Sequence, residues 1–483
     1  MRDQACLING SWTEGAGSVL TSTSPVDNAE LWSAQEAAAG DVSAAIASAR
    51  AAQPGWEATP LEHRSAVLTS FAEALESNRS TLADAISAET GKPLWEARTE
   101  VASVIGKVAL SIEAHAERNP DLSVSDVASL RHRPVGVVGV LGPFNFPAHL
   151  ANGQIIPALL AGNSVVYKPS ELTPLVASIH VGLLVEAGIP PGVLNLVVGG
   201  RGAGEAIVAG DVDAIGFTGS VATGRAIHRS LVNRPEVLLA LEMGGNNPLV
   251  VADVPDQDAV VNLIVRSAFI TSGQRCTCAR RVYIPRGHQG DTLLEQMVDT
   301  TMRLRVGAPG DDPEPFMGPV INIASATRVR AHVSELVERG GTELTRYGDE
   351  TQGAFVNPTI VAADGVQLDD DEVFGPVITV HRFDDLDTAF AMAADTKYGL
   401  AAGLVSSDPA DFDRFRQVIR AGIVNFNCPT TGASGRLPFG GVGASGNHRP
   451  AGWTAADFCA YPVATLAYDD PTESAAPIPG LGE

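Results

Sequence analysis

The stretch that decides the fold is residues 135–168, VGVVGVLGPFNFPAHLANGQIIPALLAGNSVVYK. It begins with an apolar run, passes through a loop with prolines and a helical window near 147–161, and ends in a second apolar run. Its apolar length could also cross a bilayer. Prolines and amide side chains interrupt it, however, and a broken backbone with buried amides is costly in lipid. The stretch therefore predicts a buried strand–loop–helix–strand unit and no membrane helix.

The same alternation continues on both sides of this unit. Residues 42–116 read as helices, and Thr59 is the expected N-cap of one of them, because Pro60 and Glu62 follow it. Short apolar runs and helical windows then alternate, with runs at 163–168, 193–198, 213–219 and 237–245 and windows near 174–187, 202–209 and 221–233. This pattern predicts a doubly wound α/β sheet, which binds ligands beyond the carboxyl ends of its strands.

A second α/β region is predicted from about residue 245 to residue 425. Its expected strands are 247–252, 280–285, 377–383, 399–407 and 421–427, and its expected helices lie near 257–272, 290–304, 323–340 and 386–395. The tail from residue 469 is rich in proline and polar residues, and we expect it on a surface or against a partner.

Composition limits the kinds of partner. The chain has 483 residues, of which 45% are hydrophobic and 18% charged, which is typical of a folded protein with more than one domain. Its net charge of −23 argues against nucleic acid or an anionic membrane as a partner, and solubility alone can explain the acidity. The first residues, MRDQACLING, contain no long apolar run, so we expect no signal peptide and a cytoplasmic location.

The five cysteines are few, and no CxxC, HxH or HExxH pattern occurs. We therefore expect neither a disulfide scaffold nor a metal site. Two of the thiols, Cys276 and Cys278, stand beside arginines in SGQRCTCARR (272–281). Cysteine attacks as the thiolate, and positive neighbours lower the pKa of its thiol. Cys276 is thus a candidate nucleophile, although a buried inert thiol would satisfy the same pattern.

Two polar residues follow predicted strands and could assist such a nucleophile. Glu242, in LEMGGNNP (241–248), could act as a general base or be a solvated capping residue. Asn145, in GPFNFPAHL (142–150), lies between prolines and could donate to a developing oxyanion or be an ordinary turn residue.

Two further strand ends suit a dinucleotide. Lys168 and Glu171 in VVYKPSELTP (165–174) could bind ribose hydroxyls, and the carboxylate would repel a 2′-phosphate, which favours NAD over NADP. In FTGSVATG (217–224), the residues Gly219, Ser220 and Gly224 stand where a strand turns into a helix and could bind phosphate. The cluster GGRGAG (199–204) looks more like the usual glycine motif, but glycines alone are weak support.

Taken together, these stretches resemble the aldehyde dehydrogenase superfamily over nearly the whole chain. The matching motifs, in the order of the family, are PFNFP, KPSE, FTGS with Gly224, LEMGGNNP, GQRC, EVFGP and PFGGVGASG. The resemblance implies that Cys276 is the nucleophile, Glu242 the general base and Asn145 the oxyanion donor. It further implies cofactor contacts, which are the ribose pair Lys168 and Glu171, the phosphate-binding Gly219, Ser220 and Gly224, and Glu372 and Phe374 at the nicotinamide.

The resemblance also implies an architecture. We expect an NAD-binding domain formed by residues 1–117 and 136–243, and a catalytic domain over 244–425. A β-arm for oligomerisation should comprise 118–135 and 455–470, so the protein should form a homo-oligomer, either a dimer or a tetramer.

SGQRCTCARR and GASGNHRP resemble most closely a subfamily that oxidises an acidic semialdehyde in arginine catabolism. Its substrate carries two carboxylates, so cationic side chains are candidate anchors, namely Arg275, Arg436, His448 and Arg449. Gly435, Arg436 and Leu437 depart from the small residues expected there. One alternative is a dehydrogenase of another acidic semialdehyde, such as succinate semialdehyde. Another is a non-catalytic binding or structural protein on the same fold, and a metal enzyme has the least support.

Overall fold

The computed structural model describes residues 4–253, 256–347, 352–471 and 479–480. Four helices occupy the predicted helical region, α1 (Ala39–Glu57), α2 (Leu61–Ser77), α3 (Arg79–Thr90) and α4 (Leu94–Arg118). The predicted cap at Thr59 is wrong, because the residue preceding α2 is Pro60 and no side chain caps this helix. The hydroxyl of Thr59 donates instead to the carbonyl of Gly55 (2.9 Å), since α1 ends only two residues earlier.

The first sheet is doubly wound, as predicted. Its strand order is β11-β10-β7-β8-β9-β1-β2. The parallel strands are β7 (Val137–Leu141), β8 (Ser164–Lys168), β9 (Leu194–Val197), β10 (Ala214–Gly219) and β11 (Leu238–Met243). Helices α5 (His149–Ala161), α6 (Pro174–Glu186), α7 (Arg201–Ala209) and α8 (Val221–Ser230) connect them. The antiparallel strands β1 (Cys6–Ile8) and β2 (Ser11–Thr13) extend the sheet and were not predicted.

The register of this sheet brings the predicted motifs to one edge. Leu141, at the end of β7, pairs with Lys168 on one side and with Phe217 on the other. Thr218 in turn pairs with Glu242 on β11. The strand order reverses at β7, because β8 and β9 lie on one side of it and β10 and β11 on the other. Ligands of such sheets bind in the crevice at this switch point.

The second sheet has the order β14-β15-β16-β13-β12-β17-β18. Its strands are β12 (Asn247–Val251), β13 (Ala279–Pro285), β14 (Thr342–Glu343), β15 (Thr359–Ala362), β16 (Val377–Phe383), β17 (Ala401–Val405) and β18 (Ile423–Phe426). Its helices are α9 (Gln257–Phe269), the 3-10 turn η1 (Ile270–Gly273), α10 (His288–Met302), α11 (Ile323–Glu338), α12 (Leu386–Ala394) and α13 (Pro409–Val418). The five predicted strands are present, whereas β14, β15 and α13 were not predicted.

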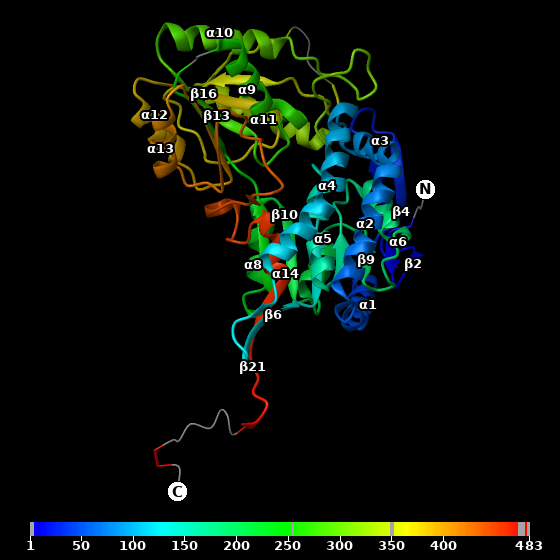
Figure 1. Cartoon of the computed structure of the whole chain (residues 1–483). Coiled ribbons are helices and arrows are strands. Elements are labelled where there is room, and N and C mark those ends of the chain that lie inside the picture. The colour runs from blue at the N-terminus through cyan, green and yellow to red at the C-terminus, as the bar shows by residue number, and fades with distance from the viewer. Residues whose placement is uncertain (1–3, 254–255, 348–351, 472–478, 481–483) are drawn as a thin grey trace.

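Each sheet packs its apolar residues into its own core, and Figure 1 shows the elements of the second sheet above those of the first. Only Gly244, Gly245 and Asn246 separate β11 from β12. Glu242 therefore lies where the chain passes from one sheet to the other. The division of the chain into a cofactor domain and a catalytic domain stays a prediction.

A third, three-stranded sheet projects from the molecule at the bottom of Figure 1. It consists of β5 (Leu122–Ser123), β6 (Ala128–Pro134) and β21 (Ala460–Leu466). Residues 455–459 do not belong to it, because η3 (Trp453–Ala455) and α14 (Ala456–Cys459) pack on α4 and α5. The role of this sheet in oligomerisation stays a prediction.

The remaining elements are short. They are β3 (Val19–Thr23), β4 (Glu30–Gln35), β19 (Pro438–Phe439), η2 (Gly443–Ser445) and β20 (Ala451–Gly452). Among the described residues, no helix combines the length and apolar character that a membrane span requires. The prediction for the tail falls largely on residues 472–478 and 481–483, which lie outside the described residues.

Candidate active site

The loop that carries Cys276 begins with an unusual backbone turn. Thr271, Ser272 and Gly273 have φ angles of 58°, 53° and 69°, all in the left-handed region. This region is unfavourable for a β-branched residue such as threonine, so the turn persists only because its surroundings hold it. The hydroxyl of Ser272 donates to the carbonyl of Gly318 (2.7 Å), and that of Thr271 donates to Glu96. A Cβ on Gly273 would lie 2.1 Å from the carbonyl oxygen of Gly375, so only glycine fits there.

Asn247 binds the other end of this loop, at Cys276 and Cys278. Its Nδ2 donates to the carbonyls of Cys276 (2.7 Å) and Cys278 (2.8 Å), and its Oδ1 accepts from the backbone N–H of Ala401 (2.9 Å). Asn247 thus ties the loop to β12 and β17. We did not single out this residue in the sequence, although an asparagine that opens a buried apolar strand is a usable signal.

The arginines beside the thiols mainly hold the loop, and only Arg280 lowers the pKa of Cys276, by less than burial and the nearby carboxylates raise it. Arg275 pairs with Glu96 (2.8 Å) and donates to the hydroxyl of Thr271 (2.7 Å). Arg280 donates to the carbonyls of Gly375 (3.0 Å) and Arg275 (3.1 Å). The guanidinium of Arg281 is likewise bonded to backbone carbonyls, those of Asn246, Met392, Ala393 and Asp395.

The two neighbouring thiols differ in their surroundings. Cys276 is partly exposed, whereas Cys278 is 0% exposed and its thiol donates to the carbonyl of Ile270 (3.8 Å). All five cysteines are free thiols. Cys276 is therefore the one of this pair that a small molecule can reach.

Three ionisable groups lie close together in the candidate site, namely the Cys276 thiol and the carboxyl groups of Glu242 and Glu372. Burial raises the pKa of the Cys276 thiol, and the negative charges of Glu372 and then Glu242 raise it further. Burial also raises the pKa of Glu242 well above its usual value and that of Glu372 to about 7. The carboxyl groups and the thiol therefore influence one another, and each carboxylate is a stronger base than an exposed one.

Glu242 is 5% exposed and has a free acceptor atom. Its Oε2 has no hydrogen-bond partner among the described residues, while the N–H of Ala451 bonds to the carboxylate. A Cβ on Gly440 would lie 2.6 Å from Glu242 Oε1, so the glycine leaves room for the carboxylate. A buried carboxylate oxygen without a partner is well suited to accept a proton from a water or a substrate.

Asn145 links the loop after β7 to the cysteine loop. The residue is 6% exposed, and its Nδ2 donates to the carbonyl of Gln274 (2.9 Å), two residues before Cys276. The amide carries two N–H hydrogens, and this bond uses one of them. Within the described part of the chain, the backbone N–H of Cys276 has no acceptor. Two donors are therefore available close to the Cys276 sulfur.

The lysine at the end of β8 lies near two carboxylates, Glu171 just after this strand and Glu36 just after β4. Lys168 is 9% exposed, its Nζ donates to the carbonyl of Pro169 (2.7 Å), and Glu171 lies 3.7 Å from it. Burial lowers the pKa of Lys168, whereas the negative charges of Glu171 and Glu36 raise it. Glu36 was not predicted and accepts from the N–H of Gly200 (2.8 Å). Carboxylates beside a buried ammonium fit the hydroxyls of a nucleotide ribose.

The turn from β10 into α8 lies at the same edge of the sheet. Ser220 caps the helix, because its hydroxyl accepts from the N–H of Thr223 (3.2 Å). A Cβ on Gly224 would lie 2.4 Å from the sulfur of Met243, and one on Gly219 would lie 2.5 Å from the Phe217 ring. The glycines thus allow close packing at a helix N-terminus, where backbone N–H groups favour a phosphate.

The segment with Glu372 and Phe374 packs against the cysteine loop. Phe374 packs edge-on against Phe144, with ring centroids 5.8 Å apart. Glu372 lies 3.7 Å from Arg280, and a Cβ on Gly244 would overlap its carboxylate, at 1.6 Å from Oε2. Glu372 therefore lies against the LEMGG turn, on the same side as Cys276.

The four candidate anchors differ in their ion-pair partners and in their exposure. Arg275 is already paired with buried Glu96, and exposed Arg436 pairs with Glu113 (2.5 Å). His448 and Arg449 are both exposed. The guanidinium of Arg449 donates to the carbonyl of His448 (3.1 Å) and has no carboxylate partner among the described residues. Arg449 is consequently the anchor candidate with the most freedom to bind a substrate carboxylate.

The described residues contain no cluster of three or more His, Cys, Asp or Glu side chains that could hold a metal ion.

Known proteins match this chain in sequence and in fold. A model of the Aldehyde dehydrogenase family matches residues 12–462. The N-succinylglutamate 5-semialdehyde dehydrogenase of Serratia proteamaculans (strain 568) is 50% identical, over 100% of this chain and 99% of the relative. The structure of PnpE in complex with nicotinamide adenine dinucleotide has a TM-score of 0.91 at 32% identity, covering 96% of this chain and 98% of that one. NADP-dependent glyceraldehyde-3-phosphate dehydrogenase from Bacillus halodurans C-125, complexed with NADP, has a TM-score of 0.89 at 30% identity, covering 97% and 99%.

Proposed function

Since the chain belongs to the aldehyde dehydrogenase family, and is therefore an oxidoreductase that acts on aldehydes with a nicotinamide cofactor, we propose that it oxidises N-succinyl-L-glutamate 5-semialdehyde to N-succinyl-L-glutamate in arginine catabolism. The observation that carries the substrate is the 50% identity, over the full chain, to a relative named for this reaction. The exposed Arg449, which has no carboxylate partner among the described residues, adds a site where a substrate carboxylate can bind.

In the proposed mechanism, the sulfur of Cys276 attacks the aldehyde carbon, and the thiol proton passes to one of the neighbouring carboxylates. Asn145 Nδ2 and the N–H of Cys276 then donate to the oxyanion. Loss of one such donor typically raises the barrier by about 2.7–4 kcal/mol. The chemistry that the nicotinamide cofactor supplies is removal of the aldehyde hydrogen with its electron pair, so a thioester remains on Cys276.

Glu242 then activates a water molecule for hydrolysis of the thioester. Its carboxylate takes a proton from the water as the oxygen attacks the acyl carbon, the C–S bond breaks, and the acid leaves. The free acceptor atom Oε2 and the raised pKa of Glu242 both suit a general base. We therefore propose hydrolysis and not transfer of the acyl group to coenzyme A.

We further propose NAD as the preferred cofactor. Lys168, with Ser220 and the adjacent glycines at the start of α8, would hold its adenosine half, and Glu372 and Phe374 its nicotinamide half. Glu171 and Glu36 place two carboxylates within the electrostatic reach of Lys168. These charges would repel the 2′-phosphate of NADP.

A substrate panel tests the proposal. We expect purified protein to reduce NAD with N-succinylglutamate semialdehyde at a kcat/KM at least tenfold higher than with succinate semialdehyde. NADP in place of NAD should lower kcat/KM by a similar factor. A preference for succinate semialdehyde would support the rival substrate, and no aldehyde oxidation at all would support a non-catalytic protein.

The anchors can be separated by single substitutions. Arg449→Met should raise KM for the dianionic aldehyde by about 10- to 100-fold, the value of one charge-assisted hydrogen bond, and leave KM for a neutral aldehyde of equal length unchanged. Arg275→Met should instead lower kcat for both aldehydes, because it leaves Glu96 buried without its partner. Equal effects of Arg449→Met on the two substrates would refute its anchoring role.

We also propose that the protein is a cytoplasmic homo-oligomer, a dimer or a tetramer. Five free thiols are typical of a reducing compartment. Strand β21 forms an edge of the projecting sheet, and Leu122, Tyr461 and Leu466 are exposed on this sheet. An unpaired edge with apolar side chains favours pairing with a second copy.

A further inference from the structure

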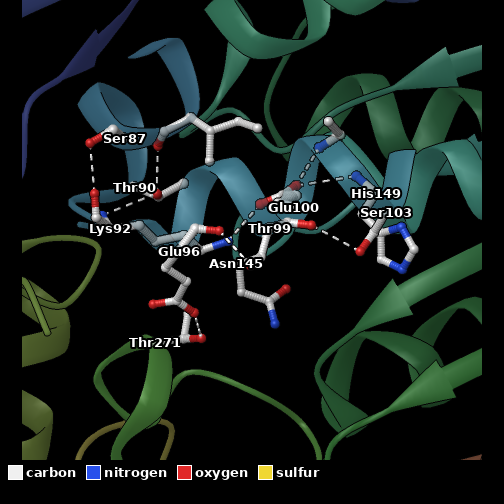
Figure 2. A network of polar contacts seen from close by, with 12 residues as sticks. Ser87, Thr90, Lys92, Glu96, Thr99, Glu100, Ser103, Asn145, His149 and Thr271 are labelled. Carbon is white, nitrogen blue, oxygen red and sulfur yellow. Dashed lines mark hydrogen bonds and ion pairs between the residues drawn. The ribbon is translucent and has the colours of Figure 1, made fainter. Parts of the chain in front are cut away.

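The helix α4 carries two buried carboxylates that reach both loops of the active site. Glu96 and Glu100 lie four residues apart, hence on one face of the helix, and are 0% and 1% exposed. Figure 2 shows them beside Asn145, Thr271 and His149. We propose that Glu96 and Glu100 are positioning residues, which hold the loop of Cys276 and the loop of Asn145 at the separation that the oxyanion requires. This inference rests on the proposed roles of Cys276 and Asn145.

Glu100 holds the loop of Asn145. Its Oε1 accepts from the backbone N–H groups of Ala148 (3.1 Å) and His149 (3.2 Å), at the start of α5. Helix N-termini leave such N–H groups without partners and favour negative charge. Only Phe146 and Pro147 separate Asn145 from these bonds, so the carboxylate fixes where this loop ends.

Glu96 holds the loop of Cys276. It accepts from Arg275 (2.8 Å), the residue immediately before the nucleophile, and from the hydroxyl of Thr271. Thr271 is one of the residues with an unfavourable left-handed backbone. Glu96 thus holds the start of the strained turn, at Thr271, and the residue before Cys276 on the face of α4.

The ring of Phe146 connects the two attachments. The Lys92 ammonium, which pairs with Glu100 (2.6 Å), lies 3.7 Å from the centroid of this ring, and the Arg275 guanidinium lies 4.9 Å from it. The four charges therefore form two ion pairs with an aromatic ring between them. His149 adds no charge at neutral pH, because burial and the nearby cations lower its pKa to about 4. Each carboxylate of the two ion pairs is thus matched by one cation, as expected for a device that fixes geometry.

A double-mutant cycle tests this role, with kcat for aldehyde oxidation as the first readout. Asn145→Ala should lower kcat by about 10²- to 10³-fold. Glu100→Gln should lower kcat by about 10- to 100-fold, because a small misplacement of a catalytic group has effects of this size. If Glu100 acts through Asn145, the double variant should be no slower than Asn145→Ala, within about twofold.

The rate of Cys276 alkylation by iodoacetamide is the second readout, because this reaction forms no oxyanion. Glu100→Gln should leave the rate within twofold of the parent, whereas Glu96→Gln should change it fivefold or more. If Glu100→Gln does not fold, Lys92→Met/Glu100→Gln carries the same test, since it leaves no buried charge alone.

Glu89 offers a matched control. It is 0% exposed and accepts from the backbone N–H groups of Leu175 (3.0 Å) and Val176 (2.9 Å) at the start of α6, as Glu100 does at α5. Glu89→Gln should keep kcat within twofold at saturating cofactor. Any of three results would overturn the inference. They are a loss of kcat in Glu89→Gln equal to that in Glu100→Gln, a further tenfold loss of kcat in the double variant, and an unchanged alkylation rate of Cys276 in Glu96→Gln. A fully active Asn145→Ala would instead refute the proposed oxyanion donor.

Discussion

Replacing Cys276 by serine should abolish aldehyde oxidation, with kcat lowered by about 10⁴-fold or more. A serine hydroxyl cannot replace the sulfur, because its pKa is far above that of a thiol, so much less of the deprotonated nucleophile is available for attack. Removal of a catalytic nucleophile in other enzymes has effects of this size or larger. The measurement is NADH formation at saturating aldehyde, with far-ultraviolet circular dichroism to establish that the variant is folded.

Two other cysteines serve as controls for this substitution. Cys278→Ser alters a buried thiol two residues away, and Cys428→Ser alters an exposed one. Both variants should retain activity within a few-fold of the parent. Mass spectrometry of the parent after brief treatment with iodoacetamide should find Cys276 modified first. A fully active Cys276→Ser, or labelling that favours exposed Cys428 over Cys276, would contradict a covalent role for Cys276.

The sequence was sufficient to predict the two large sheets, because their strands are short apolar runs with β-branched residues between helical windows. It was insufficient for β1, β2 and β15, which span only three or four residues each. Helix α13 was missed as well, although Asp408 followed by Pro409 at its start is a usable signal. The cap at Thr59 failed because the preceding helix lies close enough to bind the hydroxyl.

Only those parts of the candidate site that lie within local sequence motifs could be predicted. The motifs placed Glu242 and Asn145 at the ends of strands, and the register of the first sheet brings these two strands to one edge. What the motifs could not predict is which charge pairs with which. Arg275 looked free to bind a substrate, yet its partner Glu96 lies 179 positions earlier in the chain. Such pairings depend on tertiary packing, which the local pattern does not contain.

Replacing Glu242 by glutamine should separate the two halves of the reaction. We expect steady-state kcat to fall by about 10²- to 10⁴-fold, because the amide cannot act as the general base that activates water. The first turnover should survive, since Cys276 and Asn145 are intact and Glu372 remains as an acceptor for the thiol proton. Rapid mixing should therefore show a burst of NADH equivalent to the enzyme sites, and mass spectrometry should find an acyl group on Cys276.

The pH dependence of hydrolysis provides an independent check of the same residue. Burial raises the pKa of Glu242 well above its usual value, and the general base acts only when deprotonated. Deacylation in the parent should therefore increase as the pH rises through this elevated pKa and then level off. Glu372→Gln should keep this rise even though the pKa of Glu372 is also elevated, to about 7, whereas Glu242→Gln should lose it. If the rise persisted in Glu242→Gln and vanished in Glu372→Gln, the base would be Glu372, and the free Oε2 of Glu242 would need another explanation.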